Sequence, residues 1–234
     1  MEDVRPVPLR ARVTRLQLAI VGSALAFAAL AALVVDGRLA SIDRYALVHW
    51  MPGLNPSTAT DSIPPVEGVF VPFSLDTPWW QKLLEAITYP ASVLVSILVF
   101  GVAYAVLVRR GEKRVALVWA AAWLVANALE VGEKVAIERP GLYGSEDGTP
   151  YHVVPFDHSF PSGHAMRAVL VAAVVAFLWK RLAWPAAVWV LLMGVCLVAA
   201  SQHVPSDVAG GLIFGLLVVL ATYAALGTAR LRRS

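Results

Sequence analysis

The stretch VAGGLIFGLLVVLATYAAL, residues 208–226, carries no charged side chain from end to end. A bilayer core about 30 Å thick is crossed by roughly 20 residues of α-helix, at about 1.5 Å per residue. The stretch is therefore long and apolar enough to be a transmembrane helix. Similar runs recur along the chain and together predict six spans, over residues 16–35, 90–108, 115–135, 165–179, 184–200 and 208–226. The fourth is short and needs support from its flanks.

The composition of the whole chain also indicates a membrane protein. Of the 234 residues, 59% are hydrophobic and 15% are charged, whereas a soluble domain carries about 25% charged residues. The last three predicted spans follow one another closely, and the first is longer than the roughly 7–15 residues of a signal-peptide core. The single cysteine, Cys196, excludes an intrachain disulfide. We therefore predict an all-α fold, one integral membrane domain of six transmembrane helices over residues 1–234.

The basic residues mark one side of this predicted bundle. Of the 19 Lys and Arg residues, 13 lie before the first span, between the second and third, between the fourth and fifth, and after the sixth. Cytoplasmic segments of membrane proteins carry such an excess. Residues 1–15 and the tail 228–234 are therefore predicted to be cytoplasmic. A nucleic-acid partner is not indicated, because the basic residues flank spans and do not form one basic face.

The remaining connections should then face outward. They are residues 36–89, residues 138–163 and the short connection around residues 203–207. Residues 51–76 are rich in Pro, Ser, Thr and Gly, which is typical of an irregular loop. Apolar residues then recur at helical spacing, at Trp79, Trp80, Leu83, Leu84 and Ile87. This pattern predicts a short helix lying in the headgroup layer.

Ionisable residues gather at the outer ends of the predicted spans. Such residues are expensive at membrane depth and tend to be functional. They form three groups, far apart in sequence: Glu130, Glu133, Lys134 and Arg139; His164 and Arg167, preceded by Ser162 and Gly163; and His203 with Asp207. The topology brings all three groups to the same face of the bilayer.

These residue types suit the chemistry of a phosphate ester. A turn of small residues opening a helix exposes backbone N–H groups where the helix dipole favours an anion, and Ser162 and Gly163 fit that role. Lys134 and Arg139 can neutralise phosphate oxygens. We expect these four residues to hold a phosphoryl group.

Two histidines can divide the catalytic work at such a site. His164 and His203, on opposite sides of one phosphorus atom, can serve as acid and nucleophile. Asp207 follows His203 by four residues and can hold one imidazole nitrogen while the other attacks. Glu130 and Glu133 are expected to pair with Lys134 or a neighbouring helix and to take no part in catalysis.

These motifs resemble those of the type 2 phosphatidic acid phosphatase (lipid phosphate phosphatase) superfamily, in its bacterial six-span membrane type. The family motifs are Lys-x6-Arg-Pro, Pro-Ser-Gly-His and Ser-Arg-x5-His-x3-Asp. The second is complete at residues 161–164, and the second half of the third is present at His203 and Asp207. The resemblance implies metal-independent hydrolysis of a lipid phosphate or diphosphate at the outer face, with no cofactor, through a phosphohistidine. His203 would be the nucleophile oriented by Asp207, and His164 the acid and then the base.

The chain departs from the family pattern at two positions. Gly141 stands where the first motif has its arginine, so Arg139 would match the earlier arginine of members with Arg-Pro-Arg-Pro. Leu197 stands where the third motif has its phosphate-binding arginine. Arg167, three residues after His164 and on the same helical face, is the candidate replacement.

The sequence leaves alternatives open for both the substrate and the reaction class. An isoprenoid diphosphate such as undecaprenyl diphosphate, phosphatidylglycerol phosphate and phosphatidic acid are all candidate lipids for an enzyme of a bacterial inner membrane. The missing arginines also allow a lipid-phosphate binder or transporter without catalysis. A phosphotransferase using the same site is a third possibility. The oligomeric state is not indicated.

Overall fold

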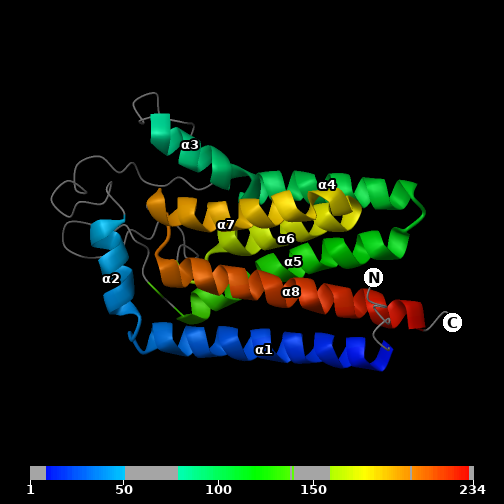
Figure 1. The fold of residues 1–234 in the computed structure, drawn as a ribbon, viewed down its shortest axis with the longest axis horizontal. Coiled ribbons are helices and arrows are strands. Elements are labelled where there is room, and N and C mark those ends of the chain that lie inside the picture. The colour runs from blue at the N-terminus through cyan, green and yellow to red at the C-terminus, as the bar shows by residue number, and fades with distance from the viewer. Residues whose placement is uncertain (1–8, 51–78, 138, 140–158, 201, 232–234) are drawn as a thin grey trace, which may run out of the picture.

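The computed structural model describes residues 9–50, 79–137, 139, 159–200 and 202–231. Long helices lie side by side in it, and the described residues contain helices and no strand, which confirms the all-α prediction (Figure 1). The helices are α1 (Leu9–Val35), α2 (Ala40–His49), α3 (Trp79–Thr88), α4 (Val93–Arg109), α5 (Lys113–Ile137), α6 (Gly163–Leu178), α7 (Ala183–Ala199) and α8 (Pro205–Leu231), with 3-10 turns at Tyr89–Ala91 and Lys180–Leu182. The predicted loop over residues 51–76 and most of residues 138–163 lie outside the described residues.

Within the described residues, four segments are long and apolar enough to cross a membrane. They are Thr14–Val35, Lys113–Ile137, Lys180–Ala199 and Pro205–Gly227. A fifth is a pair of helices, Lys82–Ala91 and Val93–Arg109, bent by 45°. The expectation of six full spans is not confirmed in the described part of the chain, because α6 has only 16 residues. At about 1.5 Å per residue it is roughly 24 Å long, short of a 30 Å bilayer core.

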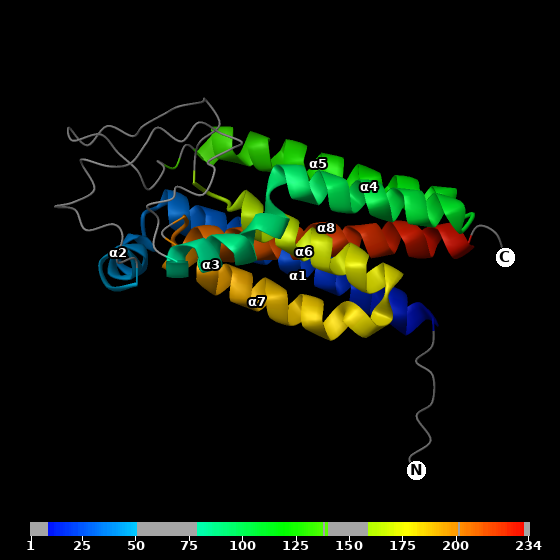
Figure 2. The ribbon, with the colours of Figure 1, turned by 90° about the horizontal axis from the view of Figure 1, so that it is seen from above.

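The short helix α6 is the centre of the bundle. It contacts α4, α5, α7 and α8, and Met166, Leu170 and Val174 along it are completely buried. Figure 2 shows α4 and α5 on one side of α6 and α7 on the other. Because protein surrounds α6, its ends do not have to reach the lipid headgroups.

The bend before α4 has a local cause. Pro90 lies in the 3-10 turn Tyr89–Ala91, and Ser92 then caps α4, its Oγ accepting a hydrogen bond from the Val95 N–H at 3.3 Å. Ser is a preferred residue at this position. The predicted second span, over residues 90–108, is therefore a helix that begins at Val93.

Glycines on α8 allow it to lie very close to α6. A Cβ atom on Gly211 would overlap the Ser162 carbonyl oxygen, and one on Gly215 would lie 2.8 Å from the Met166 carbonyl oxygen. Small residues permit such close approach of membrane helices. The close contact places the first turns of α6 and α8 against each other.

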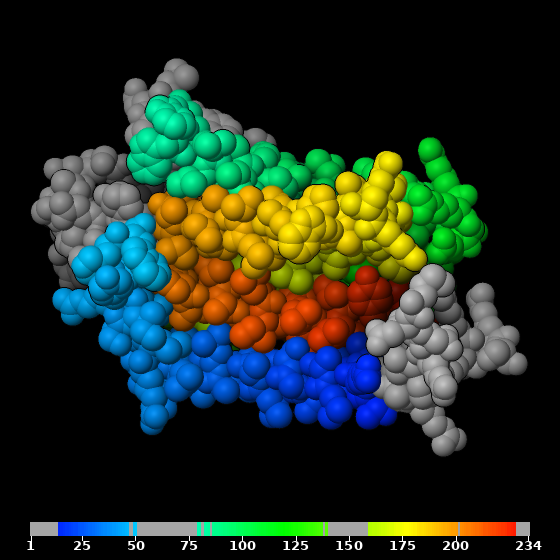
Figure 3. Space-filling view, viewed as in Figure 1, coloured from blue at the N-terminus to red at the C-terminus, as the bar shows by residue number. Residues whose placement is uncertain are grey.

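Helix α1 closes the bundle on the other side of α8. Phe27 lies 5.4 Å from Phe214 of α8 and 6.0 Å from Phe160, measured between ring centroids. In the space-filling view α1, α8 and α7 form adjacent layers, and α2 lies at the end of the bundle where α8 begins (Figure 3). Helix α1 begins and α8 ends at the opposite end.

The predicted short helix near residues 77–87 is present as α3, and its place in the headgroup layer stays a prediction. Its Trp79 and Leu83 side chains are exposed, and the Trp189 indole on α7 donates a hydrogen bond to the Ile87 carbonyl at 3.0 Å. Helix α2, in contrast, was not predicted. It lies within the segment 36–89 that the sequence indicated only as an outer connection.

Replacing Gly211 by alanine tests the α6–α8 contact. We expect Gly211→Ala to lower the melting temperature in detergent, because overpacking a tight contact costs roughly 1–3 kcal/mol. Gly101→Ala is the matched control, since a Cβ atom there meets nothing within 4 Å and alanine favours a helix over glycine by about 1 kcal/mol. Equal melting temperatures for Gly211→Ala and the unchanged protein would contradict the close contact.

Candidate active site

His203 and Asp207 lie together where α8 begins. Asp207 stands in the first turn of α8 and is completely buried. Its Oδ2 atom lies 3.5 Å from Nδ1 of His203. The backbone N–H of His203 donates to the Leu197 carbonyl at 3.2 Å, which folds the connection back onto α7. Asp207 therefore faces one ring nitrogen of His203 and leaves Nε2 on the opposite side of the ring.

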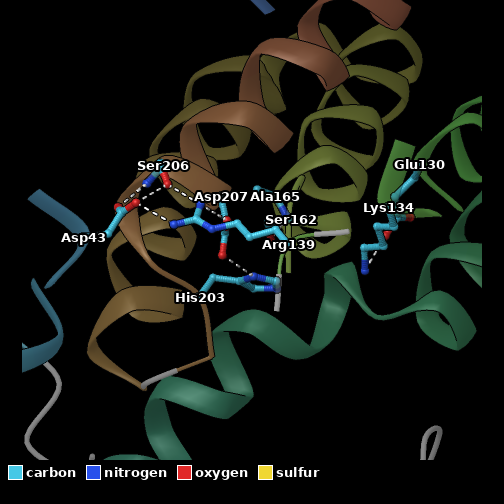
Figure 4. Close-up of polar contacts among 9 residues, drawn as sticks. All are labelled: Asp43, Glu130, Lys134, Arg139, Ser162, Ala165, His203, Ser206 and Asp207. Atoms are coloured by element: carbon cyan, nitrogen blue, oxygen red, sulfur yellow. Dashed lines mark hydrogen bonds and ion pairs between the residues drawn. The ribbon is translucent and has the colours of Figure 1, made fainter. Parts of the chain in front are cut away.

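Arg139 joins two carboxylates from distant parts of the chain. Its Nη1 donates to Asp207 Oδ1 at 2.7 Å and to Ser206 Oγ at 2.6 Å, and its Nη2 donates to Asp43 Oδ2 at 2.7 Å (Figure 4). A buried carboxylate is stable as an ion only when it is paired and hydrogen-bonded. Arg139 provides that pairing for Asp207, an arrangement that the sequence did not indicate.

The start of α6 is bonded directly to the start of α8. The Ser162 N–H donates to the Asp207 carbonyl at 3.0 Å. Ser162 is also the N-cap of α6, because its Oγ accepts a hydrogen bond from the Ala165 N–H at 3.3 Å. The Pro-Ser-Gly-His turn and the His-x3-Asp segment, predicted to meet, therefore lie side by side.

His164, in the first turn of α6, is partly buried. The side chains of Arg167, His203 and Lys134 lie close enough to act electrostatically on its imidazole. The structure thus brings the two predicted histidines and the predicted lysine into one neighbourhood. In Figure 4 the His203 ring and the Lys134 ammonium extend toward each other across the start of α6.

Glu130 pairs with two cations on the other side of the site. Its Oε2 lies 2.9 Å from Nη1 of Arg167, and its Oε1 lies 3.2 Å from Nζ of Lys134. Arg167 also donates from Nε to the Ala91 carbonyl at 2.8 Å and from Nη1 to Asn127 Oδ1 at 3.1 Å. The predicted pairing of Glu130 with Lys134 is present, and Arg167 shares the same carboxylate.

The Glu130 carboxylate lies against the N-terminal end of α6. A Cβ atom added to Gly163 would overlap that carboxylate, so only glycine allows the approach. A helix N-terminus favours an anion, and here the anion stands among Lys134, Arg167 and the first turn of α6.

The position of the missing family arginine is apolar. Leu197 is completely buried and belongs to a cluster with Ala91, Ala165, Ala168, Met193 and Val208. Gly141, the other departure, lies outside the described residues. Within the described residues the side chains of Lys134, Arg139 and Arg167 supply the cationic groups around the site, and each pairs with a carboxylate.

Sequence reasoning missed Asp43 and Ser206. Both are buried, and Ser206 donates from Oγ to Asp43 Oδ2 at 2.6 Å. Among the described residues no three His, Cys, Asp or Glu side chains are grouped so as to hold a metal ion. Asp43 gave no sequence signal, because it lies on a short helix outside every recognised motif.

Comparisons with known proteins agree with the resemblance that the sequence motifs indicate. Residues 133–231 match the family model described as the PAP2 superfamily. The chain is 25% identical over 155 residues to the undecaprenyl-diphosphatase BcrC of Bacillus subtilis strain 168, covering 58% of this chain and 77% of that protein.

The fold is also that of a solved membrane protein. The structure is similar to the crystal structure of the first transmembrane PAP2 type phosphatidylglycerolphosphate phosphatase from Bacillus subtilis, with a TM-score of 0.63 and 22% identity. The match covers 90% of this chain and 97% of that one. All the site residues carried over from the family motifs, from Lys134 to Asp207, fall inside the segment that matches the family model. The family-model match over residues 133–231, the relative and the solved structure together support the resemblance to the type 2 phosphatidic acid phosphatase (PAP2) superfamily.

Proposed function

We propose that this protein hydrolyses the phosphate or diphosphate of a membrane lipid at the outer face of a bacterial inner membrane. The observation that carries the proposal is the hydrogen bond from the Ser162 N–H to the Asp207 carbonyl, 3.0 Å long. It joins the helix that begins with His164 to the helix that follows His203. The family resemblance supports the same reaction class.

His203 is the proposed nucleophile. With its Nδ1–H directed at Asp207, Nε2 attacks the terminal phosphorus. The bond from that phosphorus to the leaving oxygen breaks, which is the lipid oxygen of a monophosphate or the bridging oxygen of a diphosphate. His164 gives its proton to that leaving oxygen. A water molecule then attacks the phosphohistidine and gives its proton to His164, which releases phosphate and restores both histidines. No metal ion takes part in the proposed steps.

The phosphoryl group is proposed to lie at the first turn of α6. The helix begins at Gly163, and a helix N-terminus favours an anion, while Lys134 and Arg167 add positive charge. Of the predicted phosphate-binding pair Ser162 and Gly163, the Ser162 N–H already donates to the Asp207 carbonyl, so Gly163 is the backbone donor proposed here. Arg139 completes the proposed set of cationic residues from the side of Asp207.

The substrate is proposed by analogy with the two relatives. One is named an undecaprenyl-diphosphatase and the other a phosphatidylglycerolphosphate phosphatase. Undecaprenyl diphosphate, phosphatidylglycerol phosphate and phosphatidic acid are therefore the lipids to test. Their common chemistry is a terminal phosphoryl group attached to an apolar lipid.

A second candidate function is lipid-phosphate binding or transport without hydrolysis. It is favoured by the apolar side chain of Leu197, buried at the family arginine position. A phosphotransferase would use the same histidines but would pass the phosphoryl group to a second acceptor in place of water.

The first test is phosphate release from the three lipids by the protein purified in detergent with EDTA. We expect release by the unchanged protein, and its loss in His203→Ala and in His164→Ala, because each removes a reacting group. Asp36→Asn, an exposed acidic residue, is the control and should release phosphate normally. Binding of every lipid without release would favour the binder, and phosphate on a second lipid or sugar would favour transfer.

The second test concerns Arg167. If its charge replaces the missing arginine, Arg167→Gln should lower turnover by about 10²-fold, the effect of losing one contact to a transition-state oxyanion. The double variant Glu130→Gln/Arg167→Gln removes the carboxylate that Arg167 neutralises and should remain as slow. Recovery of turnover in the double variant would show that Arg167 serves only Glu130.

The proposed topology has six crossings, with α6 as a short one, and both termini cytoplasmic. It is tested with single cysteines in a Cys196→Ala background. Ser41 on α2 and Glu112 in the connection from α4 to α5 are exposed. These two segments lie at opposite ends of the bundle (Figure 1). We expect Ser41→Cys to react with an impermeant maleimide in intact cells and Glu112→Cys to react only after lysis. The reverse pattern would place the site on the cytoplasmic face.

A further inference from the structure

Asp43 is a buried acid that lies outside every recognised motif and outside the segment 133–231 that matches the family model. It lies on α2 and is only 3% exposed. Its Oδ2 accepts hydrogen bonds from Arg139 Nη2 at 2.7 Å and Ser206 Oγ at 2.6 Å, and its Oδ1 accepts one from the Ser206 N–H at 3.2 Å. A surface helix therefore reaches into the site through one carboxylate.

We propose that Asp43 is a positioning residue for the reaction, which acts on His203 through Arg139 and Asp207. The proposal rests on the hydrolytic function proposed above and extends it to a residue of α2. Asp43 itself does not touch the reacting atoms.

The geometry supports this assignment first. The guanidinium of Arg139 is planar, and its donors have a fixed arrangement. Nη2 is held by Asp43, while Nη1 donates to Asp207 Oδ1 at 2.7 Å. One oxygen of Asp207 is thereby fixed, and the other, Oδ2, faces His203 Nδ1 at 3.5 Å. Asp43 thus determines where Arg139 lies, and Arg139 determines how the Asp207 carboxylate is turned.

Ser206 provides a second link in the same direction. It precedes Asp207 in the first turn of α8, and both its backbone N–H and its hydroxyl donate to Asp43. Asp43 therefore also accepts a hydrogen bond from an otherwise unpaired N–H at the start of α8, as an N-terminal cap does. The turn that carries Asp207 is held from α2 through two independent contacts.

The charges give a second argument. Asp43, Asp207 and Arg139 together carry a net charge of −1. A histidine phosphorylated on Nε2 with a proton on Nδ1 carries a positive ring. A cluster with net negative charge favours that ring, whereas Asp207 neutralised by Arg139 alone would favour it less. Asp43 supplies the extra negative charge that stabilises the positive phosphohistidine ring. Solvent screening of this charge is weak, because the site is buried.

The test is a kinetic comparison of Asp43→Asn with the unchanged protein, using the lipid that the unchanged protein hydrolyses fastest. We expect kcat to fall about 10- to 100-fold, by analogy with the loss of a group that orients a metal ligand, with KM changed less than threefold. Rapid quenching should show a matching fall in the rate of phosphohistidine formation. Asp36→Asn removes an acid from the neighbouring exposed turn and should leave both rates unchanged.

Two further measurements separate positioning from folding. Asp43→Glu restores the carboxylate and should recover part of the lost kcat, and the melting temperature reports any loss of the fold. An unchanged kcat in Asp43→Asn would overturn the proposal, and so would a loss that follows the melting temperature and is not recovered by glutamate. Absence of hydrolysis in the unchanged protein would instead overturn the proposed function. In that case the effects of Asp43→Asn and Arg139→Gln on the melting temperature can still be compared with that of the double variant. Non-additive effects would support only the contact between Asp43 and Arg139.

Discussion

The buried carboxylate of Asp207 is the constraint on which the site depends. It has no exposed surface, so as an ion it requires partners. The Arg139 guanidinium lies 2.7 Å from this carboxylate, and the His203 ring faces it at 3.5 Å. The backbone carbonyl of Asp207 accepts a hydrogen bond from the Ser162 N–H, just before α6. Three segments that are far apart in sequence are therefore joined around one residue. The position of each histidine follows from this arrangement.

Close helix packing makes the arrangement possible. Helix α6 is short and surrounded by protein, and glycines of α8 let the two helices approach until backbone meets backbone. At the site end Gly163 leaves space for the Glu130 carboxylate. Small residues thus determine both the packing of α6 on α8 and the approach of Glu130 to the first turn of α6. Stability and chemistry are linked here, because a methyl group at Gly211 would separate α6 from α8 and Ser162 from Asp207.

Much of the fold followed from the sequence, because apolar runs of membrane length have few alternatives. The candidate spans near residues 14–35, 113–137, 180–199 and 205–227 agree with the predicted ones to within a few residues at most ends. The fourth predicted span is present as the helix α6, which is shorter than a full membrane span. Its burial by the neighbouring helices, and not its length, places it in the bundle. Hydropathy shows how long an apolar run is, but it contains no information about which helices pack around that run.

The candidate site was predicted less completely. Motif spacing indicated that His164, His203 and Asp207 would meet, and the start of α6 does lie against the start of α8. It did not indicate that Arg139 bridges two acids, that Arg167 shares Glu130 with Lys134, or that Asp43 enters the site. Each of these contacts joins segments whose relative placement is set by tertiary packing. A single sequence carries no signal for such pairings, and Asp43 looked like an ordinary acid in an outer connection.

The central claim is that the phosphoryl group passes through His203, and it is tested most directly by locating that group. The protein is mixed with a lipid substrate labelled in the terminal phosphate, quenched in alkali within milliseconds to seconds, and digested for mass spectrometry. We predict an acid-labile, alkali-stable phosphoryl group on the peptide that contains His203. Phosphate release without any protein-bound phosphoryl group, or with the group on another residue, would contradict it.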